Sequence, residues 1–131
     1  MTVVPIEPEG WPRPKGYASA VSASGNTIFI SGQIGWDPLT QRFASDDFAT
    51  QVRQALANIV AVLHAAGAQP EHVTRLTWFV TDRAMYLSSR RAIGVAYREL
   101  FGRHYPAMSV VVVKQLLEFD AKVEIEATAV I

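Results

Sequence analysis

Four consecutive valines, Val110 to Val113, constrain the fold of this chain more than any other feature. A strand that is apolar on both faces has to be covered on both faces. The segment from Lys122 to Ile131 alternates polar and apolar residues, which predicts a second strand with one polar face. Its alternation puts Glu124 and Glu126 on the same face, about 7 Å apart. The chain therefore closes on a fully apolar strand and a strand that carries neighbouring carboxylates.

The pattern upstream of these strands predicts an extended arm, two helices and three further strands. Residues Met1 to Lys15, with four of the seven prolines, predict the arm. Next come two predicted strands, Ala18–Ser22 and Thr27–Ser31, which form a hairpin around Gly25-Asn26. A helix follows, capped by Ser45, Asp46 or Asp47 and ended by Gly67. The last elements before the closing strands are a strand, Val73–Val80, and a helix from Asp82 to about Phe101.

This order, ββαβαββ, predicts one α+β domain over residues 1–131. Right-handed crossovers place both helices on the same face of one mixed sheet and leave the other face uncovered. Because the valine run has to be covered on both sides, we expect a homo-oligomer built through the open face. Clefts between its subunits are then natural sites for a small molecule.

The composition excludes several classes of protein. Twelve basic and twelve acidic residues cancel, and no basic cluster stands out beyond Arg90-Arg91, so nucleic-acid binding is not expected. Without cysteine there is no disulfide, thiol nucleophile or thiolate metal site. No apolar run is long enough to span a membrane, and the first residues do not resemble a signal peptide, so we expect a cytoplasmic protein.

The sequence alone offers few candidate catalytic groups. His64, His72 and His104 lack a second ligand at metal spacing, so a structural role is favoured for each and no metal is expected. Serine nucleophiles lack the Gly-x-Ser-x-Gly turn of covalent hydrolases. The Glu124 and Glu126 pair has two interpretations: charges that protect an edge strand from unwanted pairing, or a carboxylate at a subunit boundary that handles water.

An ordered set of short motifs resembles the Rid family, also called YjgF/YER057c/UK114. The resemblance covers nearly the whole chain. It rests on Tyr17, Ser31-Gly32-Gln33-Ile34, Ala65-Ala66-Gly67-Ala68, Val80-Thr81-Asp82, Tyr105-Pro106-Ala107 and Lys122-Val-Glu-Ile-Glu-Ala.

The resemblance implies a chorismate-mutase-like α+β fold, a homotrimer with a site in each intersubunit cleft, and no cofactor. It also implies hydrolysis of reactive enamines and imines such as 2-aminoacrylate. Glu124 matches the family's water-positioning glutamate and is the candidate catalytic residue. The candidate substrate-binding residues, which follow from the same motifs, are Tyr17, Ser31, Gly32, Met108 and Ser109.

Met108 departs from the pattern, because it stands where the founding branch has an arginine that holds the substrate carboxylate. A thioether supplies neither the charge nor the paired donors of a guanidinium. Losing such a buried charged hydrogen bond costs on the order of 2 to 5 kcal/mol, enough to slow turnover of imines derived from amino acids at least tenfold. Lys114, Arg103 and Lys122 are nearby in sequence, but Lys114 would lie about 20 Å along the strand from Met108.

Three functions follow as hypotheses. The first is a hydrolase of the enamine or imine deaminase type that depends less on a substrate carboxylate. The second is a non-catalytic module that binds a small metabolite or a protein, since methionine suits permissive apolar binding. The third is ribonuclease activity or translation inhibition, which the absence of a basic stripe and of a catalytic histidine pair disfavours.

Overall fold

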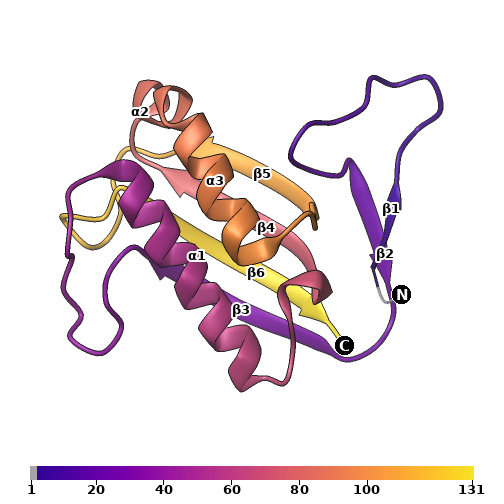
Figure 1. Ribbon diagram of the computed structural model, residues 1–131, viewed down its shortest axis with the longest axis horizontal. Coiled ribbons are helices and arrows are strands. Elements are labelled where there is room, and N and C mark those ends of the chain that lie inside the picture. Colours follow the sequence, from indigo (N-terminus) through magenta and orange to yellow (C-terminus); the bar gives the residue numbers. More distant parts are fainter. Residues whose placement is uncertain (1–2) are drawn as a thin grey trace.

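A four-stranded mixed sheet forms the centre of the molecule in the computed structural model, which describes residues 3–131 (Figure 1). The strand order is β3-β6-β4-β5, and β4 and β5 run parallel while the other neighbours are antiparallel. The strands are β3 (Thr27–Ile34), β4 (Val73–Val80), β5 (Ala107–Val112) and β6 (Val123–Val130).

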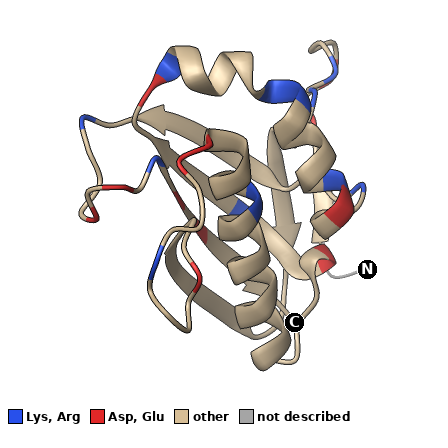
Figure 2. Ribbon diagram, turned by 60° about the vertical axis from the view of Figure 1, so that its left-hand side comes forward, with Lys and Arg blue, Asp and Glu red and all other residues tan. Residues whose placement is uncertain are grey.

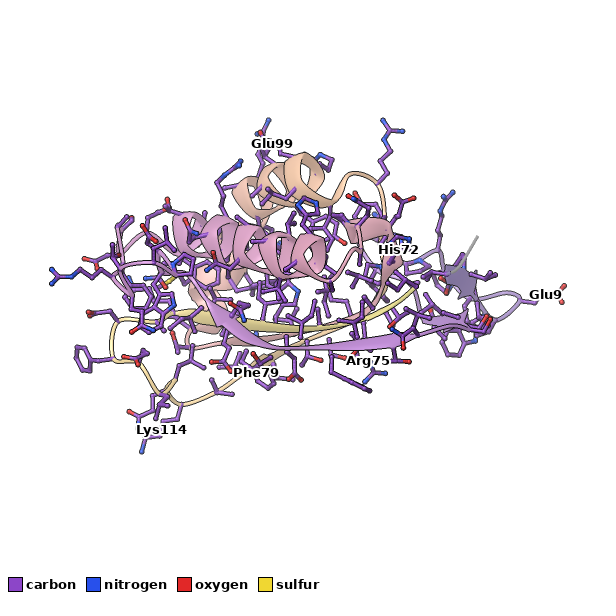
Figure 3. The ribbon with its side chains drawn as sticks, turned by 90° about the horizontal axis from the view of Figure 1, so that it is seen from below. Glu9, His72, Arg75, Phe79, Glu99 and Lys114 are labelled. Carbon is purple, nitrogen blue, oxygen red and sulfur yellow. The ribbon has the colours of Figure 1, made fainter. Side chains whose placement is uncertain are left out.

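The helices cover one face of this sheet, as the view along the sheet shows (Figure 3). They are α1 (Phe48–Ala65), α2 (Arg83–Ser88) and α3 (Arg90–Phe101), with a short 3-10 turn, η1 (Pro70–His72), before β4. Apolar residues of α1 recur at three and four residue steps, and Val52, Leu56, Ile59 and Leu63 are fully buried against the sheet. The predicted α+β architecture, with the helices on one face, is confirmed.

The helix ends follow the predicted capping residues. The Asp47 carboxylate accepts from the Thr50 backbone N–H and caps α1, and the Asp82 carboxylate caps α2 through the Met85 N–H. Gly67 adopts a positive φ of 76° just beyond α1, a conformation that favours glycine.

The prediction of one continuous helix from Asp82 to Phe101 was wrong. The chain leaves helical geometry at Ser89, which separates α2 from α3. The Ser89 N–H is shared between the carbonyls of Met85 and Tyr86, and the Ser88 hydroxyl also donates to Met85 O. Serine groups bonding the preceding turn end α2, and the chain turns before α3 begins.

The predicted hairpin around Gly25-Asn26 was also wrong. Strand β2 (Ala20–Ala23) pairs with β1 (Val3–Ile6), inside the predicted proline-rich arm, while β3 pairs with β6. Asn26 and Ile131 exchange both backbone hydrogen bonds, so the turn residues lead the chain onto the C-terminal strand instead of back onto β2. The β1–β2 ribbon projects from the sheet at one side (Figure 1).

The face of the sheet opposite the helices is uncovered, as predicted. Arg75 and Phe79 of β4 extend from it (Figure 3), and Phe29 of β3 is 81% exposed there. Val111 of the valine run, in register with Phe79, is 42% exposed on this face, whereas Val112, in register with the buried Val80, is 55% exposed on the helical side of the edge strand β5. Coverage of these residues by another subunit stays a prediction. No helix among residues 3–131 has the length and apolarity to cross a membrane.

Candidate functional site

The predicted site residues lie on opposite faces of the sheet. Met108 of β5 is in register with Leu76, which belongs to the core under the helices. Ser109 is in register with Thr77, which pairs with Glu126 on the far side of β4. Side chains alternate along a strand, so Met108 faces the helices, whereas Ser109 and both glutamates face away from them. Within one chain, Met108 and Glu124 do not meet.

On the open face, the structure brings Glu124 and Gly32 together. The pairing of β3 with β6 shifts between Ile30 and Gln33, which places Ser31 and Gly32 in an irregularity of the strand. A Cβ on Gly32 would lie 2.5 Å from Oε2 of Glu124, so only glycine leaves room for this carboxylate. Among residues 3–131, no side chain or backbone group hydrogen-bonds the Glu124 carboxylate, which leaves it available to water.

A hollow of about 390 Å³ lies beside this group on the same face. Ser31, Arg75, Thr77 and Glu126 contribute its polar lining. Ser109 lies across β4 from Glu126, about 10 Å away at two strand spacings, and it does not line this hollow.

The buried Gln51 of α1 holds the start of β6. Its Nε2 donates to the carbonyls of Ser45 and Asp120 at 3.1 and 3.0 Å, and its Oε1 accepts from the Lys122 N–H at 2.9 Å. Lys122 precedes Glu124 by two residues. A core amide therefore fixes the strand that carries the candidate catalytic carboxylate.

A second buried amide holds the end of β3. Nδ2 of Asn58 donates to the carbonyls of Ile34 and Trp36. Between them, Gly35 packs so closely on α1 that a Cβ there would lie 2.5 Å from the Gln51 carbonyl oxygen. The segment that follows Ser31 and Gly32 is thus fastened to the same helix as β6.

On the helical side, Tyr17 and Met108 line a cavity of about 580 Å³ between α3 and β5. Five of its fourteen lining residues are aromatic. Trp78 packs edge-on against Tyr86 with ring centroids 6.4 Å apart, and Tyr97 stacks on Tyr105 at 5.4 Å. Ile93, Met108 and Val110 supply the aliphatic lining.

The position of Tyr17 depends on a contact between the arm and β5. The Ala18 N–H donates to the Pro106 carbonyl at 2.9 Å, and Ala18 forms a parallel bridge with Ala107. This contact places Tyr17 near Met108 at the rim of the cavity.

The charged lining of this cavity is entirely basic. Lys15, Arg90 and Arg98 contribute to it, and no Asp or Glu does. Burial raises the pKa of Tyr86, and the charge of Arg90 partly opposes that rise. Sequence reasoning missed these arginines as site residues, although Arg90, Gly94 and Arg98 recur at four-residue steps and so share one face of α3.

Burial also raises the pKa of Tyr97, and the nearby phenol of Tyr105 adds to the rise. The Tyr97 hydroxyl donates to the His104 carbonyl, so it is a structural group at neutral pH.

Two of the three histidines, His72 and His104, make hydrogen bonds to the backbone. Nδ1 of His72 accepts from the Gln69 N–H, and Nε2 of His104 lies 2.7 Å from the Val73 carbonyl oxygen. No cluster of metal-ligating side chains occurs in the described part of the chain. Figure 2 shows Lys and Arg scattered among Asp and Glu, without a basic stripe in that view.

Comparison with known proteins gives a consistent relationship along the whole chain. A family model described as Endoribonuclease L-PSP matches residues 12–131. The 2-iminobutanoate/2-iminopropanoate deaminase of Salmonella typhimurium is 38% identical over 109 residues, covering 81% of this chain and 80% of the relative.

Solved structures agree with this relationship. The fold is similar to that of YyfB from Yersinia pestis, described as a protein of unknown function of the conserved Rid family, with a TM-score of 0.88 and 32% identity over the full length of both chains. Escherichia coli TdcF with bound serine has a TM-score of 0.69 and 35% identity, over 97% of this chain and 98% of that one.

Proposed function

The chain belongs to the Endoribonuclease L-PSP family, also called the Rid or YjgF family, and from this premise we propose that it is an imine or enamine deaminase-type hydrolase. The observation that carries the proposal is the contact between Gly32 and the Glu124 carboxylate, which keeps an unpaired carboxylate on the open face. A relative named as an imine deaminase, 38% identical to this chain, supports the same reaction class.

Glu124 orients and deprotonates the attacking water in this proposal. An enamine first tautomerises to the imine. The water oxygen then bonds to the carbon of the C=N group, while Glu124 takes one water proton and passes it to the nitrogen. The hydroxyl group of this adduct gives its proton to the nitrogen as the C–N bond breaks, which releases ammonia and leaves a carbonyl product. A positioned carboxylate acting as general base contributes typically 10²–10⁴-fold to such a step. The reaction requires neither a metal nor a cofactor, and we assign it to the cytoplasm.

A second subunit completes the site. Because Met108 and Glu124 face opposite sides of one sheet, a cleft that contains both needs the Glu124 face of one copy beside the Met108 cavity of another. The exposed Phe29 and Val111 support burial of the open face, and the family resemblance favours a homotrimer. Ser31 and Gly32 then line the cleft from one subunit, and Tyr17, Met108 and Ser109 are assigned to its lining as well.

Met108 shifts the choice of substrate away from 2-aminoacrylate. Freshly generated 2-aminoacrylate, and imines without a carboxylate, are offered to this protein and to a relative that has arginine at this position, and ammonia release is measured. We expect at least tenfold slower turnover of 2-aminoacrylate than in the relative, with measurable hydrolysis of other imines. Equal turnover of 2-aminoacrylate by both proteins would contradict the substrate shift.

A binding module remains a second candidate because of one observation. The Met108 cavity is lined by no carboxylate and no histidine, so by itself it holds no general base near neutral pH. Ligand binding without release of ammonia from any imine in the screen would favour this function over the hydrolase.

A further inference from the structure

The cavity between α3 and β5 concentrates positive charge in a chain whose net charge is zero. Lys15, Arg90 and Arg98 line it without an acidic neighbour. Among residues 3–131, no carboxylate lies within ion-pair distance of either arginine, and Glu99, next to Arg98 in sequence, pairs with Arg53 at 2.6 Å instead. Nε of Arg90 donates to the Leu87 carbonyl at 3.2 Å, which leaves its other N–H groups without a protein partner in the part of the chain that the structure describes. Guanidinium groups without an ion-pair partner beside aromatic walls favour an anion.

Gly94 makes room for one of these guanidinium groups. A Cβ on Gly94 would lie 3.2 Å from Nη1 of Arg98, so the Arg98 side chain folds back across the glycine by one helical turn. Glycine inside a helix is less favourable than alanine. The helix thus carries a destabilising residue at the place where Arg98 turns along the cavity.

Trp78, which lines the same cavity, carries an unsatisfied donor. Its Nε1 is the buried side-chain polar atom without a hydrogen-bond partner in the described residues, and the residue is 2% exposed. A buried donor without a partner is unfavourable. Because this atom is closed to solvent, an acceptor on a ligand reaches it only if the Trp78 ring shifts.

We propose that this cavity binds an anion with an aromatic or bulky apolar body, and that Arg98, with Arg90, holds the carboxylate from the α3 wall. Arg98 and Arg90 of α3 then supply, from across the cavity, the guanidinium group that Met108 lacks. The remaining walls, formed by aromatic rings, Met108 and Val110, suit an apolar body, and about 580 Å³ is within the usual volume of small-molecule pockets. If the proposed function holds, on which this step rests, the substrate class is a 2-imino acid with an aromatic or large apolar side chain.

Calorimetric titration of the full chain in its native oligomer tests the anion site without turnover. The probes are 3-phenylpropanoate, its neutral amide 3-phenylpropanamide, and propanoate, which lacks the ring. We expect wild type to bind 3-phenylpropanoate at least tenfold more tightly than either of the other probes. Arg98→Gln removes the preference for the carboxylate over the amide, whereas Arg91→Gln, an exposed change on the same helix that lines no cavity, retains it.

Gly94→Ala separates the role of the arginine from general damage to the helix. Alanine strengthens the helix, so the melting temperature is unchanged or higher, while the added methyl group displaces the guanidinium and weakens 3-phenylpropanoate binding several-fold. Equal affinity of acid and amide, no binding of 3-phenylpropanoate by wild type, or an unchanged preference in Arg98→Gln each overturns the proposal.

A turnover assay on the same proteins keeps the two proposals distinguishable. If wild type hydrolyses no imine but binds 3-phenylpropanoate through Arg98, the hydrolase proposal fails and the anion site stands. If imines are hydrolysed and binding is indifferent to Arg98, the anion site alone fails.

Discussion

The two faces of the central sheet differ in both shape and charge. The helical side holds a cavity whose charged residues are all basic, while the open side carries Glu124 and a hollow lined by Glu126. One side concentrates positive charge and the other negative charge. The difference teaches that no single cleft of one chain contains both Met108 and Glu124, since the sheet itself lies between them.

The contrast also changes the meaning of Met108. From the sequence, its thioether removes the cation that would hold a substrate carboxylate. In the folded chain it faces a cavity that already contains Arg90 and Arg98 from α3. A missing charge on a strand therefore does not make the cavity neutral.

The largest expected effect is on the open face, at Glu124. Glu124→Gln keeps the shape of the side chain but removes the base, so imine hydrolysis falls by about 10²–10⁴-fold. Steady-state ammonia release measures it, and unchanged binding of 3-phenylpropanoate shows that the cavity is intact. Glu126→Gln, on the same face of the same strand, is the matched control and retains activity. An equal loss in both variants would mean that the charge of the face, not the position of Glu124, is important.

Gly32→Ala is expected to have the next largest effect. The added methyl group meets Oε2, Cδ and Cγ of Glu124 within 2.8 Å, so the flexible carboxylate has to move while the backbone stays. We expect a loss of activity of roughly tenfold or more, corresponding to about 1.4 kcal/mol. The melting temperature should change little. A variant with wild-type activity would show that the placement of the carboxylate over Gly32 is not used.

Adjacent substitutions on β5 sharpen the comparison between the faces. Met108→Arg adds a guanidinium on the helical side, and Ser109→Arg adds one on the open side. We expect only Met108→Arg to gain hydrolysis of 2-aminoacrylate, by roughly tenfold. A gain in Ser109→Arg instead would place the substrate carboxylate on the open face.

The smallest expected effect is on the stability of helix α1, which holds β3 through Asn58 and β6 through Gln51. Asp47→Ala removes the α1 cap and costs about 1 kcal/mol in the free energy of unfolding, measured by urea denaturation near neutral pH. The Thr50 hydroxyl and then the Thr50 N–H lower the pKa of Asp47 below its usual 3.8. This stabilisation is therefore complete above pH 3.8 and disappears as the pH falls through the lowered pKa of the folded state. A difference between wild type and variant that persists under strongly acidic conditions would contradict the cap.

Local patterns predicted the elements that depend on local chemistry. Helix α1 and its end at Gly67, strand β4 and the shared face of Glu124 and Glu126 follow from periodicity and capping residues. The hairpin at Gly25-Asn26 failed because a tight turn was expected to join neighbouring strands, whereas β3 pairs with β6 nearly a hundred residues away. For the candidate site, family resemblance singled out Gly32 and Glu124, and the structure shows their contact. Arg90 and Arg98 were missed because the spacing of residues within α3 does not reveal that this helix packs beside β5.

The sequence by itself determined the α+β order of elements, which residues within one strand share a side and the replacement of the expected arginine by Met108. These properties follow from the alternation of side chains and from residue chemistry, which are local. Only the tertiary structure decided that Met108 and Glu124 are on opposite faces and that Arg98 folds over Gly94 beside Trp78. Such placements depend on strand register and on the packing of α3 against β5, which joins residues far apart in the chain.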